Sequence, residues 1–528
     1  MSSRQVRMLL VIGLAWAVIP FVSASVSASG SWDACNQAGR KALLQGKYTE
    51  AEKLLTSGLK LAEQFGAEQP EVIISLNNLA LLYDHIGAYT KAEPLYLRSL
   101  AILEPLSALD QRDLATPLNN LAALYAKQGK YPEAELMYKR SISIREKYFG
   151  LKDLKLATSL NNLAVLYCTE GKYTQAEPLY QRALAIRTAS NQQNSDLATS
   201  LDNLAGFYAD QGKYLEAEPL SKRALSIRET ALGPNHPDTA TSLSNLAVLY
   251  REKGKYSLAV PLLKRALAIQ EKALGANHPE VATTLNNLAE VYYRQGTLGA
   301  AELYKRALEI REKVFGPDHP SVAVVLNNLG ALYMQAGKFT EAKPLYERSL
   351  AILEAALGAD NVNLSMGKSN LAALDRKLGK DAEALPLYNQ SLIITEREFG
   401  PNHPNLAIVL CNLATYYRKQ GNQAQEERLF KRALKIREKV LNPDNPDLAV
   451  NLHSLADFYC KRGQFKEAEA LYKRSYAVGE KAFGINHPYL AISLTQYAGL
   501  LRQTNRQAEA AKLEARAKAI NKLTNAPK

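Results

Sequence analysis

The residues best suited to binding chemistry in this chain are asparagines that recur at a fixed spacing. If the glycine of a recurring Gly-Lys-Tyr turn is called position 15 of its repeat, an asparagine followed by leucine stands at position 6. A primary amide offers one donor group and one acceptor, which is what an extended peptide backbone needs from a binding surface. We therefore predict that these side chains bind ligand backbone. The position-6 asparagines are Asn78, Asn120, Asn162, Asn203, Asn245, Asn287, Asn328, Asn370 and Asn412.

A second interpretation of the same amides stays open. Each could bond to a neighbouring helix or loop and so serve the fold alone, because buried amides need partners wherever they lie. Position 5, which holds Asn119, Asn161, Asn286 and Asn327, is a weaker candidate for ligand contact.

Cations gather at positions 12 and 13, two helical turns beyond position 5 and so on the same helix face. The early repeats hold residues such as Asp84 and His85 there, whereas the later repeats are basic. Glu290 and Asp457 are the acids found at the groove positions of the later half, so we expect a basic surface that favours an acidic ligand. The predicted cationic contacts are Arg294, Arg376, Lys377, Arg418, Lys419 and Lys461.

Nothing in the sequence indicates catalysis or a metal site. It contains no phosphate-binding glycine loop, nucleophile elbow or HExxH motif. Five of the seven histidines precede proline at junctions between repeats. Helices in a stack lie about 10 Å apart, whereas zinc ligands lie within about 2.3 Å of one ion. We expect no enzyme activity, no cofactor and no metal, and the spacing of the four cysteines predicts free thiols.

The elements that must position these side chains repeat with a period of 41 or 42 residues. The turn glycines fall at 46, 87, 129, 171, 212, 254, 296, 337, 379, 421 and 463, and Asn505 takes the place of a twelfth. Apolar residues before and after each glycine recur at helical spacing, so each repeat reads as two amphipathic helices. A second turn, such as Gly233-Pro234-Asn235-His236-Pro237, separates many of the repeats. A fixed period of this size is typical of a solenoid.

These residues resemble the tetratricopeptide repeat. Leu288, Ala289, Tyr292, Gly296 and Tyr304 stand at its signature positions, and the 42-residue length, the Leu-Asn-Asn-Leu-Ala core and the Gly-x-x-His-Pro junction are similar to kinesin light chain repeats and their bacterial relatives. The resemblance implies an all-α, right-handed α-solenoid of about twelve units over residues 36–520. It also implies that the first helix of each unit lines a concave groove in which asparagines hold the ligand backbone.

Residues 1–28 have the layout of a secretory signal peptide. Arg4 and Arg7 precede an apolar run from Leu9 to Val22, and small residues at Val26-Ser27-Ala28 offer a cleavage site. We expect export to the periplasm or beyond the cell, with an uncleaved anchor as the alternative. Residues 29–35 would be a short lead-in and 521–528 a C-terminal tail. The net charge of +13 contains no basic block, so nucleic acid is not expected as a partner.

Together these patterns predict a non-enzymatic scaffold that binds extended, acidic protein segments in its groove. The alternative is a periplasmic scaffold subunit of an envelope polysaccharide or secretion assembly, which aromatic residues in the groove would favour. Tyr293, at position 12, is the aromatic residue that the pattern places there.

Overall fold

The computed structural model describes residues 29–106, 111–190, 194–295, 298–441 and 443–525. This part of the chain forms 24 α-helices and two short 3-10 helices and contains no β-strand, which confirms the all-α prediction. The signal segment 1–28 and the turn glycine Gly296 lie outside the described residues. Residues 29–35 form the start of the first helix, and residues 521–525 the end of the last.

The helices pair into twelve helix–turn–helix units, numbered here 1 to 12 in chain order. The pairs are α2 (Ser29–Leu44) with α3 (Tyr48–Glu63), α4 (Pro70–His85) with α5 (Tyr89–Leu106), α6 (Ala115–Lys127) with α7 (Tyr131–Phe149), α8 (Leu154–Thr169) with α9 (Tyr173–Ala189), α10 (Ser195–Asp210) with α11 (Tyr214–Leu232), α12 (Pro237–Glu252) with α13 (Tyr256–Leu274), α14 (Pro279–Gln295) with α15 (Ala300–Phe315), α16 (Pro320–Gln335) with α17 (Phe339–Leu357), α18 (Ser365–Lys377) with α19 (Asp381–Phe399), α20 (Pro404–Lys419) with α21 (Gln423–Val440), α22 (Pro446–Cys460) with α23 (Phe465–Phe483), and α24 (Pro488–Gln503) with α25 (Gln507–Asn525). The 3-10 helices η1 (Arg112–Leu114) and η2 (Val362–Leu364) lead into α6 and α18.

In eight of the twelve units a buried aromatic residue of the second helix, at the position of Tyr304, packs against the first helix. Tyr96, Tyr138, Tyr304, Tyr346, Tyr388 and Tyr472 are among the largest side chains that are fully buried. Alanine two turns from the end of the first helix, such as Ala289, lets the helices approach, and Leu288 beside it is 3 % exposed. Burial of this repeated apolar stripe is the main stabilising contribution to each unit.

The outer face carries a regular series of ion pairs between successive second helices, which the sequence pattern did not predict. Arg306 pairs with Glu271, and Arg348 pairs with Glu312 at 2.6 Å. Arg98, Arg140, Arg182, Arg265, Arg432 and Arg474 form equivalent pairs with the preceding unit. Arg306 and Glu312 remain partly exposed to solvent, and they also connect successive units. Each exposed pair contributes only about 0–1 kcal/mol.

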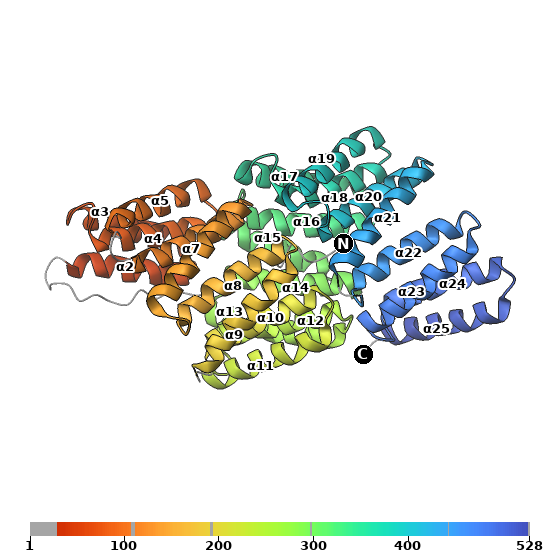
Figure 1. Ribbon diagram of the computed structural model, residues 1–528, viewed down its shortest axis with the longest axis horizontal. Coiled ribbons are helices and arrows are strands. Elements are labelled where there is room, and N and C mark those ends of the chain that lie inside the picture. The colour runs from red at the N-terminus through yellow and green to blue at the C-terminus, as the bar shows by residue number, and fades with distance from the viewer. Residues whose placement is uncertain (1–28, 107–110, 191–193, 296–297, 442, 526–528) are drawn as a thin grey trace.

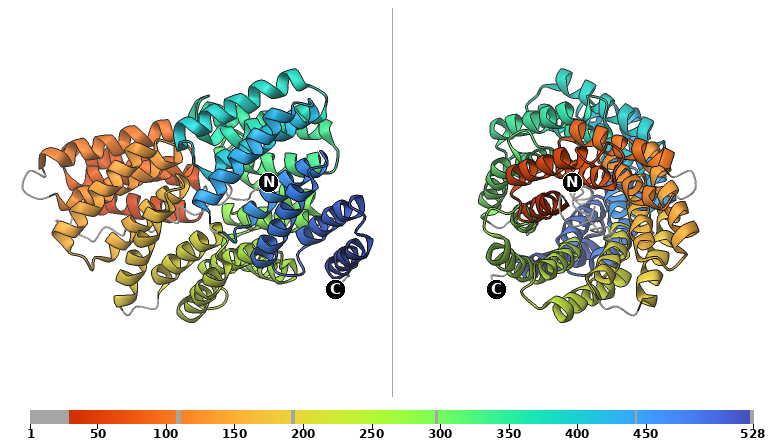
Figure 2. Two further views of the ribbon diagram at one scale, coloured as in Figure 1. Left: turned by 45° about the vertical axis from the view of Figure 1, so that its right-hand side comes forward. Right: turned by 90° about the vertical axis from the view of Figure 1, so that its left-hand side faces the viewer.

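The twelve units coil into two superhelical turns that contact each other (Figures 1 and 2). The Gly-Lys-Tyr turn of each of units 1 to 6 meets the start of the first helix six units later. Tyr48 of unit 1 stacks on Phe315 of unit 7 at 5.4 Å between ring centroids, and Tyr131 of unit 3 stacks on Phe399 of unit 9 at 5.7 Å. We call this line of contacts the seam. A unit therefore packs against more than its chain neighbours, whereas in an open repeat array each repeat contacts only its neighbours.

The residue that caps the first helix, or the 3-10 helix before it, makes polar contacts across the seam in units 9, 10 and 11. His403 accepts a hydrogen bond from the backbone N–H of Asn405 through Nδ1, so its Nε2 carries the proton and donates to the carbonyl oxygen of Thr169 at 2.9 Å. The side-chain amide of Asn361 makes the same two kinds of hydrogen bond, one within the cap and one across the seam. Its Oδ1 accepts from the N–H of Asn363, and its Nδ2 donates to the carbonyl of Gln128 at 2.6 Å. Histidine and asparagine are interchangeable here because each caps a helix with an acceptor and crosses the seam with a donor.

The seam adds a second, steric reason for glycine in the turns of units 2 to 6, where a Cβ would lie 3.0 Å or less from the later turn. Gly171 has a φ of +71°, a left-handed conformation that favours glycine, and a Cβ at this residue would lie 2.8 Å from Cδ2 of His403. Gly379 has the same kind of backbone, with a φ of +80°, but nothing lies within 4 Å of its Cβ position because no third turn follows. Both glycines therefore have a left-handed backbone, but only Gly171 lies close to a neighbouring turn.

Candidate ligand-binding inner surface

The first helices of successive units contact one another directly, as α10 contacts α12 and α12 contacts α14, and they form the inner wall of the coil (Figure 2). Positions 6 and 13 of these helices reach the same surface. Asn162 at position 6 and Lys127 at position 13 line one cavity together with Asn328 of the second turn. The structure thus brings position-6 amides of both turns, and one position-13 cation, to a common surface.

Many of the position-6 amides form a chain of hydrogen bonds between units. Asn328 donates through Nδ2 to Oδ1 of Asn286 at 3.0 Å, and Asn370 donates to Oδ1 of Asn327 at 2.9 Å. Asn78, Asn162 and Asn412 donate to position 5 of the preceding unit in the same way, and Asn245 bonds to Asp202. The structural role that the sequence left open is therefore present. Each of these hydrogen bonds uses one N–H of the amide. The Oδ1 atoms of Asn328 and Asn370 have no bond inside the described part of the chain.

The other three position-6 asparagines make no side-chain hydrogen bond within the described residues. Of these, Asn287 is 8 % exposed, while Asn120 and Asn203 are half-buried. Asn287 takes no part in the hydrogen bonds that other position-6 amides form between neighbouring units. Its amide group is therefore not required for contact between units, which makes it the cleanest place to test ligand binding.

Most of the predicted groove cations form ion pairs, so the expectation of an unneutralised basic surface is wrong. Arg294 bonds Glu290 at 2.8 Å and also faces Glu252. Arg418 pairs with Glu426 and Asp457, Lys461 with Asp457 at 2.9 Å, and Lys419 with Asp381 at 3.1 Å. Asp381 and Glu426 come from second helices, and a comparison of first-helix positions alone does not find them, whereas Glu252 stands at position 13 of the preceding unit.

Two cations of unit 9 differ from the rest. Arg376 has a buried Nε without a hydrogen-bond partner, and the exposed Lys377 forms no ion pair within the described residues. By contrast, burial would lower the pKa of Arg294, but Glu252 and Glu290 outweigh burial and raise this pKa above its ordinary value. Among the six predicted cations, the two without an ion pair in the described residues thus both lie on α18.

The histidines, cysteines and acidic residues of the described chain do not form a metal site or a reactive thiol site. The described residues contain no cluster of three or more His, Cys, Asp or Glu side chains that could hold a metal ion. The cysteines of this region are unpaired, and burial raises the pKa of the Cys168 and Cys411 thiols, which makes them poor nucleophiles. Among the helices of the described chain, none is long and apolar enough to span a membrane.

The family model for the tetratricopeptide repeat matches residues 36–104, 113–189, 196–272, 258–304, 298–355, 363–439 and 447–522. The chain belongs to the tetratricopeptide repeat family, whose repeats form scaffolds for protein–protein interaction. No curated protein matches the chain.

Solved structures that are similar to this chain include kinesin light chain-like proteins. A point variant of the nearly identical TPR-like repeats of a putative kinesin light chain from Podosopora anserina is 30% identical, with 38% of this chain and 94% of that chain covered and a TM-score of 0.33. BtubC (BKLC) from P. vanneervenii is 26% identical, with 42% and 91% covered and a TM-score of 0.35. A Rap protein complexed with Competence and Sporulation Factor is 17% identical, with 70% and 99% covered and a TM-score of 0.46.

Proposed function

We propose that this protein binds an extended protein segment along the inner wall of its coil. The observation that carries the proposal is the row of position-6 amides: Asn162 and Asn328 line one cavity between the two turns, and the Oδ1 atoms of Asn328 and Asn370 have no bond within the described residues. Such atoms accept from the N–H groups of an extended backbone, while the remaining amide N–H groups donate to its carbonyls. The role is that of a scaffold, and no residue is assigned to catalysis.

We further propose that an acidic part of the segment lies near unit 9. Arg376 and Lys377 are the predicted cations that no carboxylate neutralises through an ion pair in the described chain. Arg294, Arg418, Lys419 and Lys461 then act mainly in holding the inner wall, since their charge is already balanced. The sequence predicted a basic surface over several units, and the present proposal places the acidic contact at α18 alone.

The experiment compares four single variants, two at asparagines and two at lysines, in titrations against a peptide selected from a random dodecapeptide display library. Asn287→Ala removes an amide without a bond to the protein, so it should weaken binding by about 1–3 kcal/mol and leave thermal unfolding unchanged. Asn286→Ala serves as the matched control, because its Oδ1 supports Asn328 and its loss should lower stability. Unchanged binding by Asn287→Ala would show that the amides serve only the fold.

Lys377→Ala tests the acidic preference. An exposed charge pair contributes about 0.2–1 kcal/mol, and salt screens it, so the loss of affinity should be visible at low salt and vanish at high salt. Lys305 on the outer face, whose side chain is 48% exposed, provides the control for a change of net charge alone. Equal effects of Lys377→Ala and Lys305→Ala would contradict a specific acidic contact at α18.

We propose, in addition, that the protein is exported. The support is the Arg4 and Arg7, apolar run and small-residue layout of residues 1–28. N-terminal sequencing of the protein from native cells tests it, and the expected first residue is close to Ser29. An intact Met1 in a cytosolic fraction would overturn the proposal. The polysaccharide or secretion assembly remains the alternative class of partner, with Tyr293 as its single predicted aromatic contact.

A further inference from the structure

A cavity of about 120 Å³ lies where the two turns of the coil meet. Its walls come from units that are far apart in the sequence, with Val165 and Leu166 of α8 on one side and Ala323 and Val324 of α16 on the other. Tyr138, Leu166 and Ala323 are almost completely buried. The cavity is therefore lined mainly by apolar atoms held in place by packing across the seam.

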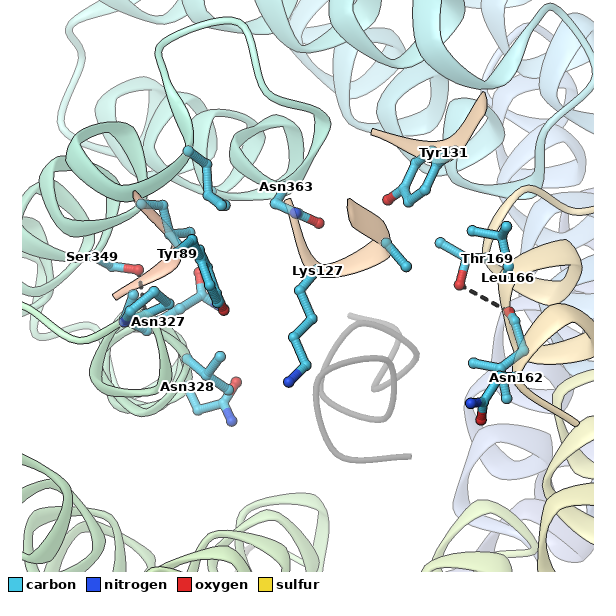
Figure 3. A pocket seen from close by; sticks show the side chains of 18 of the residues that line it. Tyr89, Lys127, Tyr131, Asn162, Leu166, Thr169, Asn327, Asn328, Ser349 and Asn363 are labelled. Carbon is cyan, nitrogen blue, oxygen red and sulfur yellow. Dashed lines mark hydrogen bonds between the residues drawn. The ribbon is translucent and has the colours of Figure 1, made fainter. Parts of the chain in front are cut away.

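Polar side chains stand on either side of this cavity. Asn162 and Asn328 lie opposite each other, with Lys127 between them (Figure 3). Lys127 is held in place by Asp84, since its Nζ bonds both carboxylate oxygens at 2.8 Å. The amides of Asn162 and Asn328 are fixed by their bonds to Asn119 and Asn286. Amides that are already oriented lose little entropy when a ligand backbone binds them.

We propose that this cavity receives one aliphatic side chain of the bound segment, of the size of leucine, isoleucine or methionine, while Asn162 and Asn328 hold the backbone on either side of it. This inference rests on the proposed function and names the side chain that the inner wall selects. An apolar cavity of about 150 Å³ accommodates a benzene ring, so the smaller volume here suits a branched or linear aliphatic group and excludes an indole. An apolar wall also holds water poorly, which favours its replacement by such a side chain.

The position of the cavity has a consequence for the ligand. Because α8 belongs to the first turn and α16 to the second, the segment contacts both turns at once. Neither turn alone completes the cavity, so selection of the aliphatic side chain depends on the closed seam.

Filling the cavity provides the test. Val165→Phe places a larger side chain into it from α8. Val248→Phe is the matched control, because Val248 occupies the same position 9 in unit 6, is also half-buried and does not line the cavity. The probe is the random dodecapeptide display library, selected separately on the parent protein and on both variants. Thermal unfolding identifies a variant that does not fold, and Val324→Phe then fills the cavity from the opposite wall.

Peptides selected by the parent and by Val248→Phe should share leucine, isoleucine or methionine at one position, whereas Val165→Phe should select alanine or glycine there. A leucine-containing peptide should lose about tenfold or more in affinity for Val165→Phe, since overpacking of this size is costly. Retention of the aliphatic preference by Val165→Phe, equal losses in both variants, or tryptophan at that position in the parent's peptides would overturn the inference while leaving the proposed function standing. If the parent selects no peptide, the proposed function fails and the inference fails with it.

Discussion

The Nε2 atom of His403 lies 2.9 Å from the carbonyl oxygen of Thr169, although 234 residues separate the two in the chain. This hydrogen bond joins unit 10 to the turn of unit 4. Similar polar contacts from Asn361 and Asn445 reach Gln128 and Asp210. The chain is therefore held as a coil of six units per turn by contacts that are specific in chemistry as well as in shape.

The first prediction concerns the donor at the seam. His403→Asp keeps an acceptor that caps α20 but cannot donate to Thr169, so it should lower the free energy of unfolding by about 1–3 kcal/mol. His403→Asn should be nearly neutral, because asparagine fills both roles at residue 361. Urea denaturation measures the difference.

His236 supplies the control for this prediction. It caps α12 in the same way, but unit 6 has no preceding turn to contact, and its side chain is 41% exposed. His236→Asp should change stability by less than about 0.5 kcal/mol. If His236→Asp and His403→Asp destabilise equally, the effect belongs to the helix cap and the seam bond contributes nothing.

The second prediction separates backbone strain from contact between turns. Gly171→Ala and Gly379→Ala both place a Cβ on a left-handed backbone, which costs roughly 1–2 kcal/mol at either site. Only the Cβ at residue 171 meets a neighbouring turn, at His403, so Gly171→Ala should cost about 1–3 kcal/mol more. Thermal and urea unfolding of the two variants, each compared with the parent, decide the matter, and equal costs would argue against a tight seam.

The third prediction is a loss of stability in mild acid. Burial lowers the pKa of His319 to about 3 and that of His487 to about 4, and it also lowers the pKa of His278. An unfolded histidine has a pKa of about 6.5, so below this value the unfolded chain binds more protons than the folded chain. Stability should therefore fall as the pH drops from about 6.5 towards 4.

The pH dependence should weaken when the seam histidines are replaced. Asparagine keeps the cap and the donor but does not titrate, so the double variant His319→Asn and His487→Asn should lose part of the slope between pH 7.5 and pH 5. His85 is also buried, with its pKa lowered to about 4, and will retain some of the slope. An identical slope in parent and double variant would assign the effect to His85 and to other groups outside the seam.

The fourth prediction concerns packing within a unit. Leu288 is 3 % exposed, and Leu288→Ala should cost about 2–5 kcal/mol, as deletions of buried leucine do. Lys305→Ala on the outer face should leave stability essentially unchanged, because surface substitutions of this kind remove little packing. Urea midpoints measured for the two variants should differ clearly, and equal midpoints would mean that the inner and outer faces are assigned wrongly.

Helix periodicity and turn glycines were sufficient to predict twelve two-helix units, because each unit specifies its own helices through local spacing and caps. The number of units per turn was not predictable in this way, since it depends on a small rotation between units that accumulates over six of them. The caps do not show it either. Every unit from 7 to 12 begins with histidine or asparagine, which can donate, but so do units 5 and 6, with Asn194 and His236.

The candidate site was predictable in its positions but not in its charge. The resemblance to the tetratricopeptide repeat implied that position 6 lies on the inner face, and Asn162 and Asn328 do line one cavity. The balance of charge depends on Asp381 and Glu426, which reach the inner wall from second helices. Contacts of this kind depend on packing between helices, which a repeat pattern read one helix at a time does not contain.

The seam also changes how the molecule responds to force. An open solenoid stretches like a spring, because small rotations between neighbouring units add up along its length while every interface stays intact. Here a pull along the axis meets the stacked turns first, and the contacts made by residues such as His403 and Asn361 must separate before the coil can lengthen. The protein should therefore resist weak pulling forces. At higher force the seam contacts should break one after another, starting at the ends of the coil.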